Sequence, residues 1–210
     1  MEFMDILNML TRWGHLLFGM TWIGLLYYFN FIQGGYFKSA TPEGLADGKA
    51  KLAPAALWWF RWGAMFTFIT GVILLKSVWK MNVMNDYIIV GAVMGTLMFL
   101  NVWLIIWPNQ KVALGMVEGD APSAGAKALL ASRTNTLFSA PMAFCMLAGP
   151  HFAGYGMGTG SMGMWAALAV VAVLEINGLM GKQGPMTTVR GVIVSSLVLT
   201  AIIIGMLVFM

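Results

Sequence analysis

The sequence predicts an all-α integral membrane protein, a bundle of about six transmembrane helices with both termini on the outer side. Hydrophobic residues make up 60% of the 210 residues and charged residues only 10%, whereas soluble domains carry about 25% charged residues. A water-soluble fold of this size cannot bury so much apolar surface, but a lipid bilayer solvates it. Six apolar runs, each long enough to cross a hydrocarbon core about 30 Å thick, indicate the number of spans.

The six runs divide the whole chain, residues 1–210, into the spans of a single domain without a visible repeat or linker. The predicted spans are residues 9–33, 55–79, 87–107, 128–148, 164–180 and 189–210. The longest polar stretch, residues 34–54, is expected to form a loop. Residues 149–163 should form another loop, which is rich in glycine and contains no Asp, Glu, Lys or Arg.

Two prolines are expected to interrupt the helices. Pro108 should end the third span, because proline has no N–H to continue the helical hydrogen bonds. Pro141 lies inside the fourth span, where it should kink the helix and free a backbone carbonyl near Leu137. Such a kink either makes room for a ligand or only shapes the packing.

The distribution of Lys and Arg predicts the orientation. Nine of these residues lie in, or next to, the loops after the first, third and fifth spans: Lys38, Lys49, Lys51, Arg61, Lys111, Lys127, Arg133, Lys182 and Arg190. Only Arg12, Lys76 and Lys80 lie on the opposite side. Because cytoplasmic loops are enriched in Lys and Arg, we expect the odd-numbered loops in the cytoplasm and both termini outside.

The composition also excludes several kinds of site and partner. Cys145 is the only cysteine, which excludes a disulfide framework and a cysteine-rich cluster within one chain. No Cys-x-x-Cys-His motif occurs, so covalent c-type haem is not expected. The net charge of +4 comes from basic residues at helix ends, and a nucleic-acid partner is not expected.

One face of the first span carries a candidate haem b site on the outer side. The residues that share this face at helical spacing are Arg12, His15, Gly19 and Trp22. His15 would bind the iron, and Gly19 would let the flat macrocycle approach the helix. Arg12 would pair with a propionate, and Trp22 would lie at the edge of the macrocycle. The candidates for the second axial ligand are His151, Met142 and Met146.

Other interpretations of the two histidines stay open. His15 is alternatively a structural histidine bonded to a neighbouring helix, or part of a proton relay. Copper(I) prefers thioether and imidazole ligands, and the 149–163 loop offers His151, Met157, Met162 and Met164. Methionine more often fills apolar cores, so haem b remains the leading hypothesis, with His15 and His151 as metal ligands.

A second set of polar side chains gathers at the inner ends of the predicted spans. Its candidate substrate contacts are Arg61, Asn109, Gln110, Arg133, Asn135 and Glu175, and Asn30, Gln33, Asn101 and Asn177 lie at the same level. Two arginines and several amides suit a planar anion or a quinone head group. The alternative is structural, in which Arg61 pairs with Glu175 and the amides join the helices.

Four segments of the chain, over about residues 10–147, resemble one family. The segments RWGHLLFGMTWIGLLYYFNFIQ, WWFRWGAMFTFITG, IIWPNQK and SRTNTLFSAPMAF occur in the order found in the N-terminal membrane domain of bacterial membrane-bound urate oxidases (urate hydroxylases). The first segment alone is also similar to the haem-binding helix of the membrane protoporphyrinogen oxidase family. The urate oxidase resemblance implies a bacterial inner membrane, with the outer side periplasmic, and electron transfer to a cytochrome c domain, whose Cys-x-x-Cys-His motif does not occur in these 210 residues.

These observations leave three functional hypotheses. In the first, the chain is a membrane redox protein that binds haem b near the outer face. It would pass electrons from a small planar substrate or a quinol to a separate c-type cytochrome. In the second, it is a non-catalytic accessory subunit of a larger respiratory or photosynthetic complex, and in the third it carries a small anion. Whether the chain is itself an enzyme, and whether it forms a homo-oligomer, stays open at this point.

Overall fold

The computed structural model describes residues 3–152 and 158–210, and these residues form helices and no β-strand. The first long helix consists of α1 (Phe3–Tyr27), the π-helical segment η1 (Tyr28–Gln33) and α2 (Gly34–Ser39). The second consists of α3 (Pro42–Asp47), the π-helical η2 (Gly48–Leu52) and α4 (Ala53–Lys80). The third consists of α5 (Asp86–Leu100), the π-helical η3 (Asn101–Ile106) and α6 (Trp107–Ala113). The chain continues through α7 (Ala121–His151), α8 (Met162–Met180), the 3-10 turn η4 (Gly184–Thr187) and α9 (Val189–Phe209).

Side-chain caps mark where these helices begin. In each case a side-chain oxygen accepts a hydrogen bond from a backbone N–H of the first turn, which satisfies a donor that has no partner inside the helix. The capping residues are Thr41, Asn85, Asp120, Ser161 and Thr188.

The prediction of a loop over residues 34–54 was wrong. Only Ala40 and Thr41 have extended backbone there, and helix continues on both sides of them. Thr41 caps a new helix, and Pro42 stands in its first turn, a position that tolerates proline. The prediction that Pro108 ends the third span was also wrong, since Pro108 occupies the first turn of α6 and the helix runs on to Ala113.

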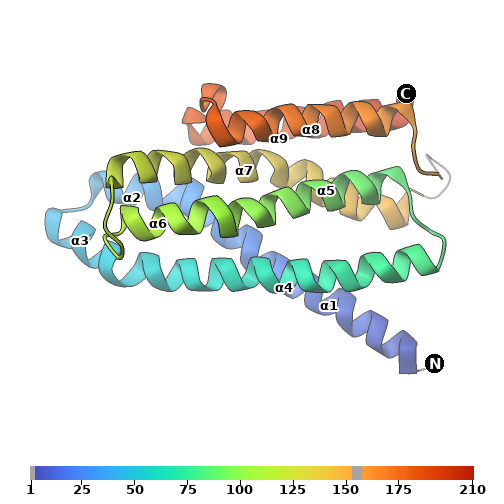
Figure 1. Cartoon of the computed structure of the whole chain (residues 1–210), viewed down its shortest axis with the longest axis horizontal. Helices are drawn as coiled ribbons and strands as arrows, with labels where there is room; N and C mark the ends of the chain where they lie inside the picture. Colours follow the sequence, from blue (N-terminus) through green and yellow to red (C-terminus); the bar gives the residue numbers. More distant parts are fainter. Residues whose placement is uncertain (1–2, 153–157) are drawn as a thin grey trace.

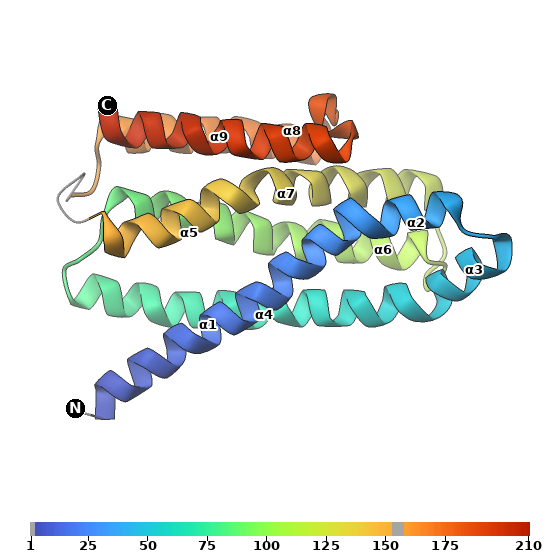
Figure 2. The ribbon, with the colours of Figure 1, turned by 180° about the vertical axis from the view of Figure 1, so that it is seen from behind.

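Successive long helices run in roughly opposite directions, and α7 lies at the centre of the bundle (Figure 1). It contacts α5, α6, α8 and α9, and also the end of the first helix. The main partner of α1 is α4, and the N-terminal half of α1 diverges from the other helices (Figures 1 and 2). The start of α1 and the end of α9 lie at the same end of the bundle (Figure 1), as the alternating direction of six predicted spans requires.

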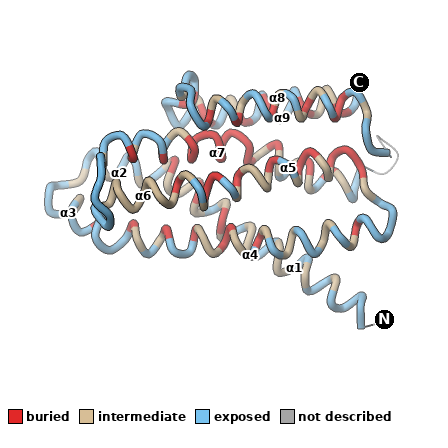
Figure 3. The backbone as a smooth tube through the Cα atoms, viewed as in Figure 1, coloured by how far each residue is buried: buried red, intermediate tan, exposed pale blue. Residues whose placement is uncertain are grey.

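Burial explains why one predicted span differs in composition from the others. Five helices of the described residues are long and apolar enough to cross a membrane, and α7, which contains the predicted span 128–148, is not among them. Residues 131–139 of α7 are all buried and include Ser132, Arg133, Asn135 and Ser139, as the red stretch along α7 shows in Figure 3. A helix that is enclosed by other helices bonds to protein groups, so it can carry polar side chains that a lipid-facing helix cannot.

The predicted effect of Pro141 on the backbone is confirmed at one carbonyl. Pro141 lies within α7 and has no N–H to offer the carbonyl of Leu137, four residues earlier. The hydroxyl of Ser196 on α9 donates to that carbonyl at 2.8 Å, and Ser196 is buried. The proline therefore creates an acceptor that fixes α9 against α7.

We expect Ser196→Ala to lower the free energy of unfolding in detergent by about 1 kcal/mol, the net value of a typical buried hydrogen bond. In a Pro141→Ala background the Leu137 carbonyl regains a helical donor, so the same substitution should cost much less. Ser195→Ala on the same helix serves as the control. Equal losses from Ser196→Ala in both backgrounds would contradict this account of the carbonyl.

Candidate functional site

A cavity of about 500 Å³ opens at the end of the bundle opposite the chain ends, between the end of the first helix and α6–α7. Its polar and aromatic lining residues are Phe29, Asn30, Gln33, Phe37, Lys49, Gln110 and Ser132. The cavity therefore combines aromatic rings, amide groups, a hydroxyl and one ammonium group. Of the predicted substrate contacts, Gln110 is the one that lines it.

Two amide oxygens in this cavity have no hydrogen-bond donor among the described residues. Asn30 is only 4% exposed, and its Nδ2 donates to the Leu26 carbonyl at 2.9 Å and to Ser132 Oγ at 2.8 Å. Its Oδ1 is buried and unpartnered, and so is Oε1 of Gln33 one turn later. A buried acceptor without a donor costs free energy, so an N–H group brought beside either oxygen would stabilise this end of the cavity.

Three π-helical segments place side chains in or next to this cavity. Segment η1 carries Asn30 and Gln33, and η2 carries Lys49. Segment η3 begins at Asn101, in a buried network close to the cavity helices. A π-turn shifts the register of a helix and redirects its side chains, and such turns are frequent at functional sites.

Sequence reasoning missed two lining residues, Lys49 and Ser132. In the sequence, Lys49 contributed only to the prediction of the membrane orientation, and Ser132 lies within the predicted span 128–148. No periodic signal marks either one. Lys49 lies in the π-helical η2, and Ser132 lies in a helix that is enclosed by its neighbours.

Asn101, Asn135 and Glu175 form a buried network that joins three helices. Asn101 Nδ2 donates to Asn135 Oδ1 at 2.9 Å and to Glu175 Oε2 at 3.2 Å. Asn135 Nδ2 in turn donates to the Met98 carbonyl at 2.9 Å. Both polar atoms of Asn135 are thus engaged with protein neighbours, and the network fixes η3, α7 and α8 beside the cavity.

The two predicted arginines contact different helices. The Arg61 guanidinium stacks on the Trp107 ring, with Cζ 3.3 Å from the ring centroid. Arg133 Nη1 donates to the Thr188 carbonyl at 3.4 Å. Among the described residues the two arginines do not contact each other, and neither forms an ion pair with a carboxylate. The alternative that Arg61 pairs with Glu175 is therefore wrong for these residues.

Both arginines nevertheless keep free donors. Arg61 Nε and Nη1 and Arg133 Nε are buried without a hydrogen-bond partner in the described residues. Asn109, another predicted contact, donates to the carbonyl of Ile105 in its own helix at 2.8 Å. The predicted inner cluster is thus divided into the cavity, the Asn101 network and two separate arginines.

In the middle of α1, His15 is held by α4. Its Nδ1 lies 2.9 Å from the Thr67 carbonyl and 3.1 Å from Thr70 Oγ1. A carbonyl oxygen can only accept, so Nδ1 carries the proton and Nε2 keeps its lone pair. A Cβ at Gly71 would lie 3.1 Å from His15 Cε1, so a glycine at this position makes room for the imidazole. Anchoring one ring nitrogen on a carbonyl is how ligating histidines are usually oriented, so His15 fits an axial ligand.

The other residues of the predicted haem face do not surround His15. A Cβ at Gly19 would lie 3.9 Å from Thr67 Cγ2, and Trp22 is only 2% exposed. Both residues face α4, which leaves no room for a macrocycle on that part of α1. Arg12 is exposed, and its Nε donates to Asn8 Oδ1 at 2.8 Å.

His151 is the exposed last residue of α7, and no contact joins it to His15 within the described residues. The described residues contain no group of three or more His, Cys, Asp or Glu side chains that could hold a metal ion. Met157, one of the candidate copper ligands, lies outside the described residues.

No curated protein and no solved structure matches the chain. One family model matches residues 81–208, from the end of α4 to α9. The matched range includes the Asn101 network and Gln110, and His15, Asn30 and Lys49 precede it. It covers more than half of the chain and confirms the resemblance predicted from the sequence motifs. The matching model is that of the urate oxidase N-terminal family, and the chain belongs to this family.

Proposed function

We propose that this protein is a membrane redox protein of the urate oxidase type that binds a planar, N–H-rich purine substrate, such as urate, in the inner cavity. The observation that carries the proposal is the pair of unpartnered amide oxygens, Asn30 Oδ1 and Gln33 Oε1, in a cavity of a chain of this family. Neither the cavity nor the family favours the accessory-subunit hypothesis.

The chemistry of urate complements the cavity lining. Urate is flat, carries several N–H donors and is a monoanion at neutral pH. Its N–H groups would donate to Asn30 and Gln33, and its negative charge would lie near Lys49. Phe29 and Phe37 would contact the ring.

Oxidation of such a substrate releases electrons, which need an acceptor. Haem b near the outer face, if bound, would supply the one-electron chemistry for this role, with a separate c-type cytochrome as the next acceptor. His15 would hold the iron through Nε2, because Thr67 fixes its Nδ1–H. Gly19 and Trp22, which are packed against α4, would not line this haem.

In this proposal the chain crosses a bacterial inner membrane six times, with both termini in the periplasm. Five helices are apolar enough to span, and α7 is the sixth, shielded from lipid by its neighbours. The excess of Lys and Arg at the cavity end supports a cytoplasmic location for that end.

We expect alkaline phosphatase fused after Met210 to be active and a fluorescent protein fused there to remain dark, because only the former matures in the periplasm. Fusions after Gln183, in the turn between α8 and α9, should give the reverse result. The chain should also stay in the pellet after alkaline carbonate extraction. A fluorescent fusion after Met210 would contradict the orientation.

Lys49→Gln should weaken urate binding two- to five-fold in equilibrium binding to purified protein, the effect of removing one partly solvated charge. The matched control is Lys51→Gln, since Lys51 lies on the same segment but pairs with Asp47. The affinity for a neutral purine should change little in either variant. Equal effects of the two substitutions on urate would show that Lys49 has no specific role.

Purified protein should show a Soret band that His15→Ala abolishes, because the axial ligand is lost. Thr70→Val removes only a neighbouring hydroxyl and should retain the band. His151→Ala should change the spectrum only if His151 is the second ligand. A folded but colourless wild-type preparation would contradict the haem assignment and leave the substrate cavity as a separate question.

A further inference from the structure

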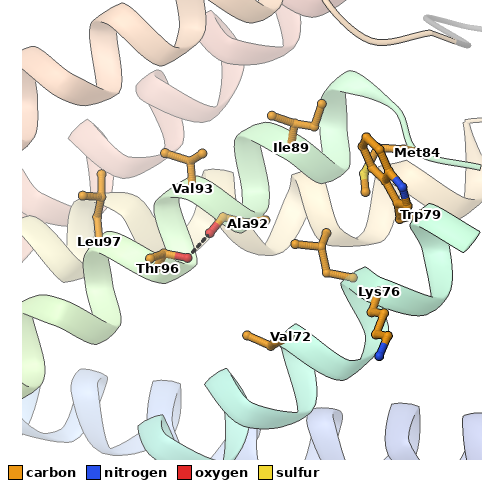
Figure 4. A pocket seen from close by; sticks show the side chains of 10 residues that line it. Val72, Lys76, Trp79, Met84, Ile89, Ala92, Val93, Thr96 and Leu97 are labelled. Atoms are coloured by element: carbon orange, nitrogen blue, oxygen red, sulfur yellow. Dashed lines mark hydrogen bonds between the residues drawn. The ribbon is translucent and has the colours of Figure 1, made fainter.

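A second cavity, of about 620 Å³, lies between α4 and α5 near the end of the bundle where the chain begins and ends. Most of its lining is aliphatic, from residues such as Val72, Ile89, Val93 and Leu97, which Figure 4 shows around the groove. The Thr96 hydroxyl in its wall donates to the Ala92 carbonyl at 2.8 Å, so this donor is already used. The groove therefore offers an apolar surface to its occupant.

One end of the groove carries a positive charge and an indole ring, whereas the rest is aliphatic. Lys76 and Trp79 line it within the last two turns of α4, which ends at Lys80. Lys76 has no carboxylate partner in the described part of the chain. Trp79 is 73% exposed. Tryptophan and lysine at the end of a span are typical of the interface between lipid tails and head groups.

The length of the groove suits a hydrocarbon chain. On α5 the lining runs from Ile89 to Leu97, which is about 12 Å at 1.5 Å per residue. Because α5 begins at Asp86 and α4 ends at Lys80, this surface starts near the level of Lys76 and continues deeper into the span toward Leu97. A ligand that fills the groove thus needs a negative group at the interface and an apolar chain that extends toward the bilayer centre.

We propose that this groove binds an anionic phospholipid, with its phosphate on Lys76 and one acyl chain along Val72, Ile89 and Leu97. This inference depends on the membrane insertion proposed above, and on neither the substrate nor the haem.

Native mass spectrometry of the full chain in detergent tests the proposal, with phosphatidylglycerol and phosphatidylcholine of identical acyl chains as probes. Wild type should bind phosphatidylglycerol several-fold more tightly. Lys76→Gln should remove this preference, and Lys80→Gln, which loses the same charge on the same helix outside the groove, should keep it. Ala92→Phe should fill the groove and weaken binding of both lipids, and its melting temperature checks that the variant is folded.

Three results would overturn the proposal. The first is an equal loss of preference in Lys76→Gln and Lys80→Gln, which would indicate a non-specific surface charge effect. The second is unchanged binding in a folded Ala92→Phe variant. The third is a competition result. If a neutral isoprenoid quinone displaces phosphatidylglycerol equally well from wild type and from Lys76→Gln, the charge of Lys76 does not hold the lipid. Removal of the wild-type chain from membranes by carbonate extraction would contradict membrane insertion itself. Retention of the chain without a preference between the two lipids would contradict only the lipid site.

Discussion

The rest of the structure depends on how the polar groups of α7 find partners. Every residue from 131 to 139 is buried, and a buried polar group without a partner costs more than a hydrogen bond gains. The first long helix, the third long helix and α9 supply partners. Asn30 bonds to Ser132, Tyr27 shares a hydrogen bond with Ser139, Asn101 bonds to Asn135, and Ser196 bonds to the carbonyl of Leu137. These bonds fix the rotation of the surrounding helices about α7, which apolar packing alone does not specify.

The same requirement connects the fold to the proposed substrate cavity. Asn30 uses its Nδ2 to hold α7, so its Oδ1 is left without a donor in a residue that lines the cavity. The π-turn that carries Asn30 also carries Gln33, whose Oε1 is equally unpartnered. The π-helical segment η1 thus carries an amide, that of Asn30, whose nitrogen bonds to α7 and whose oxygen has no donor.

His15 shows that a structural role and a ligating role use different atoms of one side chain. The bond from Nδ1 to the Thr67 carbonyl attaches α1 to α4. The same bond fixes the tautomer and leaves Nε2 available. Arg61 is similar, because stacking on Trp107 fixes its guanidinium plane and leaves Nε and Nη1 free. The packing therefore preorganises both side chains without using all of their bonding capacity.

The sequence by itself determined the helical class, the number of long helices and their alternating direction, because length, apolar composition and charged ends are local properties. It also predicted the free carbonyl near Leu137, since the missing N–H of Pro141 is a covalent fact. Only the tertiary structure decided that α7 is central, that 34–54 is helical, and that Arg61 and Arg133 contact different helices. It alone brought Asn30, Lys49 and Gln110 to one cavity. Helices that are apolar on every side carry no periodic signal for the face that turns inward, so contacts between distant residues depend on helix rotation and π-turns.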